Sequence, residues 1–405
     1  MKKRGPFRAI ASAQARLGVA GGLTCWTQAA SRLHNAARSP SWALPRNDCL
    51  SMTSFLHNIW YFAMPAEALK PGGLVHKVLL GEPIVIGRSA GGEVFALRDI
   101  CPHRGVPLSA GKLFEPGEGG CASATVECPY HGWKFRTDGH CAEIPSLVPD
   151  QNVDVDKIRV RAYPTREVQG NIWVFMASAE EADRAPGIEP PVMPDIGEAA
   201  VPKLRESMVF DCHIDHAVIG LMDPAHGPFV HQSWYWRTTR SIHEKAKAFA
   251  PADFGFKMVE HRPSSNSFAY KLLGGTPTTE ISFRLPGIRI EHIKVGKHRV
   301  IGLTSVTPVD EKHTEITQSF YWTMPFLSVV RPIARGFVRA FLKQDRDMVN
   351  LQQEGLRFDP RLMLINDADV QAKWYHQLKN EWETAESEHR SFVNPVKPAT
   401  LRWRS

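Results

Sequence analysis

The chain has 405 residues, which is long enough for two domains that each bury a hydrophobic core. Its formal net charge is +7, but residues 1–51 alone contain eight basic residues and one acidic residue. Subtracting these from the totals of 49 basic and 42 acidic residues leaves 41 of each, so the basic balance gives no reason to expect nucleic-acid binding. No run of 18 apolar residues occurs, which excludes a membrane-spanning helix.

Residues 1–51 are basic, rich in Ser and Ala and almost free of acids, which is similar to an organelle transit peptide. A mis-assigned start would produce the same pattern, since Met52 stands directly before the first domain-like sequence. We favour the mis-assigned start, expect this segment to be disordered and predict a cytoplasmic protein. A transit peptide would instead place the protein in an organelle stroma or matrix. The cysteines indicate no disulfide framework, which suits a reducing compartment.

Short apolar runs separated by turns follow, and they predict an all-β module over residues 54–165. The Gly91-Gly92 pair is typical of a hairpin turn between two of these strands. The predicted strands of this module cover residues 77–80, 83–87, 94–100, 133–136 and 158–162.

Two short motifs inside this module each combine one cysteine with one histidine: Cys101-Pro102-His103 and Cys128-Pro129-Tyr130-His131. A Rieske [2Fe–2S] cluster uses two thiolates on one iron and two imidazoles on the other. A structural zinc site has the same ligand inventory, but zinc fingers usually bring two cysteines together and two histidines together. The mixed motifs therefore favour the Rieske cluster over zinc.

At these residues the sequence resembles the Rieske proteins, whose motifs are C-x-H and C-x-x-H. The respiratory-chain members of that family carry two further cysteines that form a disulfide over the cluster. Val106 and Tyr130 occupy the corresponding positions here. The resemblance therefore implies a lower-potential, oxygenase-type cluster bound by the two cysteines and two histidines of the motifs.

A second domain is predicted over residues 166–405. An apolar strand is expected at Asn171–Met176, and the proline-rich residues 179–200 have the composition of a linker. Further strands are predicted at 207–212, 267–273, 280–285, 288–295, 300–307 and 314–323, and helices at 326–356, bent near Pro332, and at 367–387. Consecutive strands separated by turns indicate an antiparallel sheet, so the fold class is α+β.

His226 and His231 form the second candidate site, in the segment that begins at Asp223. Two residues five positions apart lie about 140° round an uninterrupted helix, so their imidazoles would not converge. Pro228 disfavours the helical conformation at Gly227 and removes a backbone donor. We therefore expect the helix to break between the two histidines, which would allow both rings to bind one metal ion.

Non-haem Fe(II) oxygenases bind iron through two histidines and one carboxylate. Asp345 shares one face of a predicted helix with Phe341, Leu342, Met348 and Val349. Burying a lone carboxylate on an apolar face is costly, and a cation would remove that cost. Asp345 is therefore the predicted third ligand.

This arrangement resembles the catalytic α-subunit of the Rieske non-haem iron oxygenases over about residues 54–355. The resemblance implies that His226, His231 and Asp345 bind a mononuclear Fe(II). It also implies that Asp223 acts in catalysis, linking an iron-bound histidine to a cluster histidine of the neighbouring subunit. The residues KQDR around Asp345 are similar to the late-helix motif of the vanillate and dicamba O-demethylase branch.

The family resemblance implies a Rieske domain followed by a helix-grip catalytic domain, and a homotrimer. Electrons would pass from the [2Fe–2S] cluster to Fe(II), with O2 as co-substrate, to hydroxylate or oxidatively demethylate an apolar or aromatic substrate, as in aromatic hydrocarbon catabolism. The chain has no dinucleotide-binding fingerprint, so electrons from NAD(P)H would arrive through a separate reductase, with or without a ferredoxin. The alternative is a Rieske electron carrier with a non-catalytic helix-grip ligand-binding domain.

Overall fold

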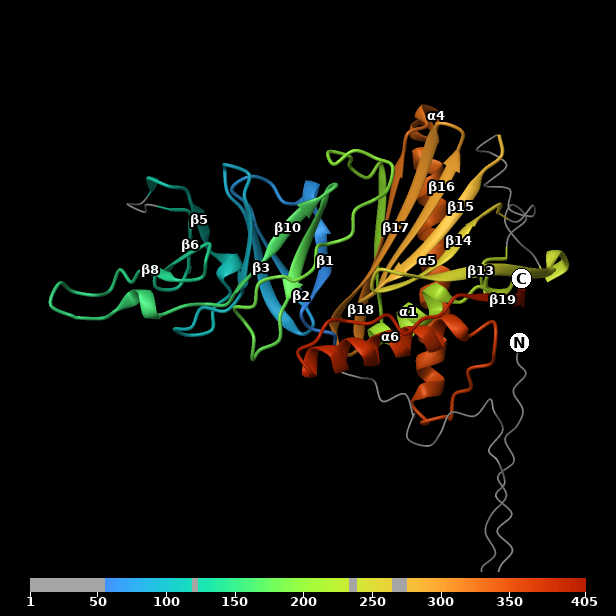
Figure 1. The fold of residues 1–405 in the computed structure, drawn as a ribbon. Helices are drawn as coiled ribbons and strands as arrows, with labels where there is room; N and C mark the ends of the chain where they lie inside the picture. Colours follow the sequence, from blue (N-terminus) through green and yellow to red (C-terminus); the bar gives the residue numbers. More distant parts are fainter. Residues whose placement is uncertain (1–54, 119–122, 233–238, 264–274) are drawn as a thin grey trace, which may run out of the picture. The chain divides into compact units, whose positions relative to one another are not determined.

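Three small antiparallel sheets form the N-terminal part of the protein in the computed structural model, which describes residues 55–118, 123–232, 239–263 and 275–405 (Figure 1). The first sheet contains β1 (Ile59–Pro65), β10 (Thr165–Val168) and β11 (Asn171–Met176). The second contains β2 (Leu74–Leu79), β3 (Glu82–Arg88), β4 (Val94–Arg98) and β9 (Ala162–Tyr163). The third contains β5 (Lys112–Phe114), β6 (Thr125–Glu127), β7 (Lys134–Arg136) and β8 (Cys141–Glu143).

The second and third sheets share one hydrophobic core. Val85 on β3, Val126 on β6 and Phe135 on β7 have no exposed surface and belong to the same buried cluster as Cys101 and Cys128. The all-β module predicted from the sequence is therefore confirmed, and its core holds the two cysteines, one after β4 of the second sheet and one after β6 of the third.

One eight-stranded antiparallel sheet dominates the C-terminal part, with the strand order β12-β18-β17-β16-β15-β14-β13-β19. Its strands are β12 (Leu204–Phe210), β13 (Glu244–Ala252), β14 (Gly255–His261), β15 (Thr278–Arg284), β16 (Ile288–Val295), β17 (His298–Asp310), β18 (His313–Trp322) and β19 (Ala399–Arg404). The strand predicted at 267–273 lies outside the described residues. The predicted fold class, an all-β module followed by an antiparallel sheet with helices, is confirmed.

Helices pack against this sheet: α1 contacts β17 and β18, and α5 contacts β12, α1 and α2 (Figure 1). The helix predicted at 326–356 is divided before Pro332, which occupies the first turn of the longer piece, where proline is tolerated. No described helix is both long and apolar enough to cross a membrane. The helices are α1 (Ile214–Met222), α2 (Gly227–Val230), α4 (Pro325–Val329), α5 (Arg331–Leu356) and α6 (Val370–Ser387), with 3-10 turns at Ala66–Ala68, Leu108–Ala110, Val155–Lys157 and Thr239–Ser241.

The strand Asn171–Met176 belongs to the N-terminal sheets, because β11 pairs with β1 from Asn171 to Met176 and with β10 from Asn171 to Val174. The predicted division into residues 54–165 and 166–405 stays a prediction. The pairing of β11 favours a boundary after Met176, in the segment that leads to β12.

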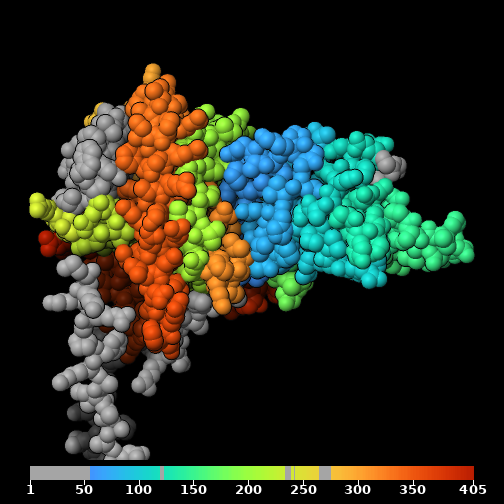
Figure 2. All heavy atoms as spheres, turned by 180° about the vertical axis from the view of Figure 1, so that it is seen from behind, coloured from blue at the N-terminus to red at the C-terminus, as the bar shows by residue number. Residues whose placement is uncertain are grey.

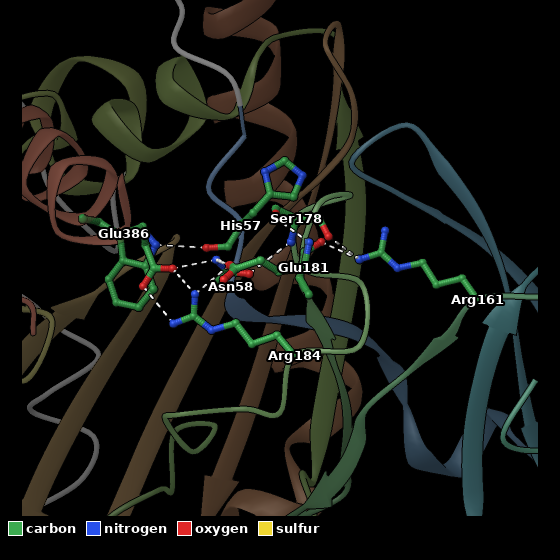
Figure 3. Close-up of polar contacts among 9 residues, drawn as sticks. His57, Asn58, Arg161, Ser178, Glu181, Arg184 and Glu386 are labelled. Atoms are coloured by element: carbon green, nitrogen blue, oxygen red, sulfur yellow. Dashed lines mark hydrogen bonds and ion pairs between the residues drawn. The ribbon is translucent and has the colours of Figure 1, made fainter. Parts of the chain in front are cut away.

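Asn58 connects three distant parts of the chain (Figure 3). Its Nδ2 donates hydrogen bonds to Glu181 Oε2 at 2.9 Å and to Glu386 Oε2, on α6, at 2.6 Å, while its Oδ1 accepts one from the Ser178 backbone N–H at 3.0 Å. Arg184 Nη1 lies 2.8 Å from Glu181 Oε2 and 2.5 Å from Glu386 Oε2. The Asn58 amide and the Arg184 guanidinium therefore hold together two carboxylates that would otherwise repel each other.

Replacing Arg184 tests this junction. Arg184→Met leaves the Glu181 and Glu386 carboxylates converging on one amide, so we expect the free energy of unfolding to fall by about 1–2 kcal/mol. The measurement is urea unfolding followed by circular dichroism. Arg159→Met is the matched control, because the Arg159–Asp183 ion pair is exposed on both sides and its loss costs at most about 0.5 kcal/mol. Equal losses in the two variants would contradict the proposed importance of the junction.

Candidate metal centres

The two cysteine–histidine motifs form a pair of loops with the same backbone hydrogen bonds. The Cys101 N–H donates to the Val106 carbonyl at 2.9 Å, and the Gly105 N–H donates back to the Cys101 carbonyl at 2.8 Å. In the second loop the Cys128 N–H donates to the carbonyl of residue 133 at 2.8 Å, and the Gly132 N–H donates to the Cys128 carbonyl at 3.1 Å. Both glycines have positive φ, 73° and 70°, a conformation that costs other residues more.

The loops place the four predicted cluster ligands in two layers. Cys101 and Cys128 are each 2% exposed, whereas His103 and His131 lie at the surface. The two imidazole rings are neighbours, with centroids 4.5 Å apart, and the ring of Trp133 stacks on that of His103 at 4.8 Å. Two buried sulfurs and two outer imidazoles match the division of ligands in a Rieske cluster.

The pKa shifts in these loops fit metal ligands. Burial raises the pKa of the Cys101 thiol to about 11, and the neighbouring Cys128 thiol contributes to the same shift. Partial desolvation, His131 and Arg104 together lower the pKa of His103, which favours the neutral imidazole that binds metals. Without a cation the Cys101 thiol keeps its proton at neutral pH, so loading a cluster must release protons.

His226, His231 and Asp345 converge on one point, with one ligand atom from each lying within 4.8 Å of the others. The two Nε2 atoms are 3.2 Å apart, and Asp345 Oδ1 lies 3.1 Å from His231 Nε2 and 3.8 Å from His226 Nε2. Asp345 comes from the middle of α5, more than a hundred residues beyond the histidines. Two imidazoles and one carboxylate on one side of an ion form the ligand set of a non-haem Fe(II) site.

The local backbone explains the convergence, and it corrects one expectation. The helix does not break between the histidines: α1 ends before Asp223, and the single turn α2 lies between His226 at its N-terminal end and His231 at its C-terminal end. Pro228 is in the first turn of α2, where its missing N–H leaves no bond unmade. His231 departs from helical geometry, with ψ of 39°, so both rings stand at the ends of one turn.

Each histidine has a polar partner at its other ring nitrogen. The His231 Nδ1–H donates to Gln344 Oε1 at 3.0 Å, which leaves Nε2 with its lone pair for a metal. His226 Nδ1 is buried without a hydrogen bond, and Asp223 Oδ2 lies 3.6 Å away. Burial opposes protonation of His226, but the carboxylates of Asp223 and Asp345 outweigh it and raise the pKa of the ring. This excess of negative charge is what a bound cation would compensate.

Gln344 was not singled out in the sequence, although it directly precedes Asp345. Lys343 and Asp347 lie at the surface and pair with each other at 2.5 Å. The Gln344 side chain instead reaches His231, and the Phe341 ring stacks on the same imidazole at a centroid distance of 4.2 Å. The only sequence signal for such a partner is the general need of a metal-binding histidine for one.

Two cavities meet at this site. The larger, of about 540 Å³, is bordered by His226, His231 and Asp345 and lined by six phenylalanines: Phe249, Phe256, Phe283, Phe320, Phe337 and Phe341. The second, of about 510 Å³, lies between α1 and α5 and is bordered by Asp223, His226 and Asp345. A cavity of several hundred Å³ with mostly apolar walls and few polar groups is typical of a small-molecule site.

Comparison with known proteins assigns both parts of the chain. Residues 59–164 match the Rieske [2Fe-2S] domain, and residues 210–385 match the vanillate O-demethylase oxygenase C-terminal domain. The chain therefore contains a Rieske domain, which binds a [2Fe–2S] cluster. The second match covers α1, α2 and α5, which carry the three converging side chains.

Among curated relatives, chlorophyllide a oxygenase of Chlamydomonas reinhardtii is 35% identical over 45% of this chain and 25% of its own length. The oxygenase component of dicamba O-demethylase from Stenotrophomonas maltophilia is 32% identical over 44% of this chain and 49% of its own. The chain thus spans between a quarter and a half of these relatives. The crystal structure of dicamba monooxygenase bound to dicamba has the same fold, with a TM-score of 0.65 and 21% identity over 83% of this chain and 100% of that one.

The hydrogen bond from His231 to Gln344 gives a test of the second centre. Gln344→Leu removes the acceptor that fixes the His231 tautomer, so we expect bound Fe(II) to be retained about 10- to 100-fold less tightly. Iron content after dialysis against graded concentrations of a chelator measures this loss. Gln377→Leu makes the same change at an exposed position of α6 that lines neither cavity, and it should leave the retention unchanged. Equal retention in both variants would rule out the role of Gln344.

Proposed function

Since this chain belongs to the Rieske non-haem iron oxygenases, we propose that it is a terminal oxygenase component that hydroxylates or oxidatively demethylates an apolar or aromatic substrate. A separate NAD(P)H-dependent reductase, with or without a ferredoxin, delivers the electrons. The observation that carries the proposal is the convergence of His226, His231 and Asp345 at the end of a largely apolar cavity. Relatives named as oxygenase components of demethylase, monooxygenase and dioxygenase systems support it.

The proposed ligands divide between two metal groups. Cys101 and Cys128, with His103 and His131, hold the [2Fe–2S] cluster, and the histidine pair with Asp345 holds Fe(II). When bound, the cluster supplies single electrons and the Fe(II) ion supplies the activation of dioxygen.

The side chains around the proposed Fe(II) site orient its ligands and hold the substrate. Gln344 keeps the Nδ1 proton on His231, and Asp223 faces Nδ1 of His226, so both Nε2 atoms point to the same position. The phenylalanine walls exclude water and accept an apolar substrate body. An apolar body packed against these walls is held in one orientation, so less orientational entropy is lost when the reacting geometry is reached.

We also propose that the protein is a homotrimer in which the cluster of one subunit serves the Fe(II) of the next. One support is the exposed edge formed by His103 and His131, whose outer imidazoles can reach a partner. A second support is α5, the helix that also bears Asp345, which lies at the surface of the face shown in Figure 2. It carries apolar side chains that are 42% to 65% exposed. These side chains are Ile333, Phe337, Met348 and Leu351. Asp223 would then be the bridge between the two centres.

The assembly is tested by light scattering after size-exclusion chromatography. The expected mass is three times the 45.3 kDa of one chain. Ile333→Asp together with Leu351→Asp places two charges on the exposed face of α5 and should yield monomers, because buried unpaired charges are strongly unfavourable. Both positions are more than 60% exposed in the single chain, so the substitutions leave its core intact. A monomeric wild type that turns over at full rate would refute the trimer.

Iron analysis distinguishes the oxygenase from the alternative Rieske electron carrier, which has a non-catalytic ligand-binding domain. The oxygenase contains three irons per chain, and the carrier contains two. His226→Ala should lower the count from three to two, preserve the visible spectrum of the cluster and slow the O2-dependent reoxidation of the reduced protein at least about tenfold. His313→Ala, at an exposed position on β18, is the control and should change none of these readouts. Unchanged reoxidation in His226→Ala would support the carrier.

A further inference from the structure

We propose that the larger cavity recognises an acidic group of the substrate through Lys247, so that the substrate is an anion with an apolar body. This inference rests on the proposed oxygenase function and specifies its substrate class. It starts from three cationic side chains that line the largely apolar cavity, Lys245, Lys247 and Arg289. The carboxylates of Asp223, Glu291 and Asp345 line the same cavity.

The alternation of β13 directs both lysines into the cavity. Residues 245, 247 and 249 lie on one face of the strand, and all three line the cavity, while the exposed Glu244, Ala246 and Ala248 face the other way. Phe249, two positions beyond Lys247, is buried against the rings of Phe256 and Trp374. The face therefore changes along the strand from cationic to aromatic.

Two of the three cations already have partners in the structure. Arg289 Nη2 lies 3.3 Å from Glu291 Oε2, and Glu291 also lines the cavity. Lys245 is buried, and its Nζ donates a hydrogen bond to Ser405 Oγ at 2.8 Å. These contacts fix the two side chains in place.

Lys247 differs, because its Nζ donates a hydrogen bond to a neutral group, the Arg262 carbonyl oxygen, at 3.2 Å. No carboxylate of the described residues forms an ion pair with it, and residues 264–274, which follow Arg262 closely in the chain, contain no acid. Partial burial lowers the pKa of the Lys247 ammonium, which indicates a charge without full compensation. An anion in the cavity would provide that compensation.

The resulting arrangement has two ends that suit a bifunctional ligand. The ammonium of Lys247 attracts a carboxylate or sulfonate, and the aromatic walls formed by Phe249, Phe256 and Phe283 accept an aromatic or aliphatic body. A single charged contact at one end of an apolar cavity fixes which end of the ligand faces His226, His231 and Asp345. Lys247 is therefore a specificity-determining residue.

The test compares an acid with its neutral isostere in the iron-loaded wild-type protein. The probes are 4-methoxybenzoate and 4-methoxybenzamide, and isothermal titration calorimetry measures their dissociation constants. We expect the acid to bind at least about tenfold more tightly than the amide. Lys247→Met should remove this preference without weakening the amide, whereas Lys247→Arg, which keeps the charge, should retain it. Lys297→Met, an equal change of charge at an exposed turn, should behave as wild type.

Three outcomes would overturn the proposal: an acid preference that persists in Lys247→Met, equal binding of acid and amide to the wild type, or no binding of either probe. His226→Ala separates the Lys247 contact from direct binding of the acid to iron, since the preference should survive in that variant. Its loss there would assign the acid to the iron and also overturn the proposal. The iron count of the same preparations reports independently on the proposed oxygenase function.

Discussion

The close approach of His226, His231 and Asp345 is the interaction on which the second half of the molecule depends. Two imidazole nitrogens 3.2 Å apart and a carboxylate oxygen 3.1 Å from one of them meet only if separate elements are held in register. The histidines belong to a single helical turn, and the aspartate belongs to a helix formed a hundred residues later. The packing of α5 against α1, α2 and β12 therefore determines whether a three-ligand site exists at all.

The Rieske module brings its four proposed ligands together without relying on elements that are far apart in the sequence. Its four proposed ligands lie within 31 residues, and two loops with matching hydrogen bonds present them from one small core. Buried sulfurs and exposed imidazoles follow directly from this arrangement, because each cysteine begins its loop at the core and each histidine projects from the tip. Electrons can then enter or leave through the imidazole side, which is where a neighbouring subunit must lie if Asp223 is a bridge.

The grouping of the four proposed cluster ligands was predictable because the ligand spacing in the two motifs is short. In Cys101-x-His103 and Cys128-x-x-His131 the backbone has little freedom, so the sequence nearly determines the geometry. Asp345 was predictable from the cost of placing a carboxylate beside the apolar Leu342 and Val349, which are buried, although its own side chain is 35% exposed. By contrast, β13 was not predicted, since it has no β-branched residue and Phe249 is its one aromatic residue, whereas β-branched and aromatic residues favour strands. Gln344 was missed because its role depends on a tertiary contact that no spacing encodes.

β13 and Gln344 are two of the features that were not predicted, and β13 supplies residues that line the larger cavity. Gln344 accepts a hydrogen bond from His231, and the lysines of β13 lie on a strand that pairs with the last strand of the chain, β19. Lysine is unfavourable on an apolar wall because its ammonium loses solvation there. The pairing of the strand does not require it, since valine could occupy the position. The charge at Lys247 is therefore better explained by a ligand than by the fold, and the same cavity that accommodates an apolar body also selects for an acid.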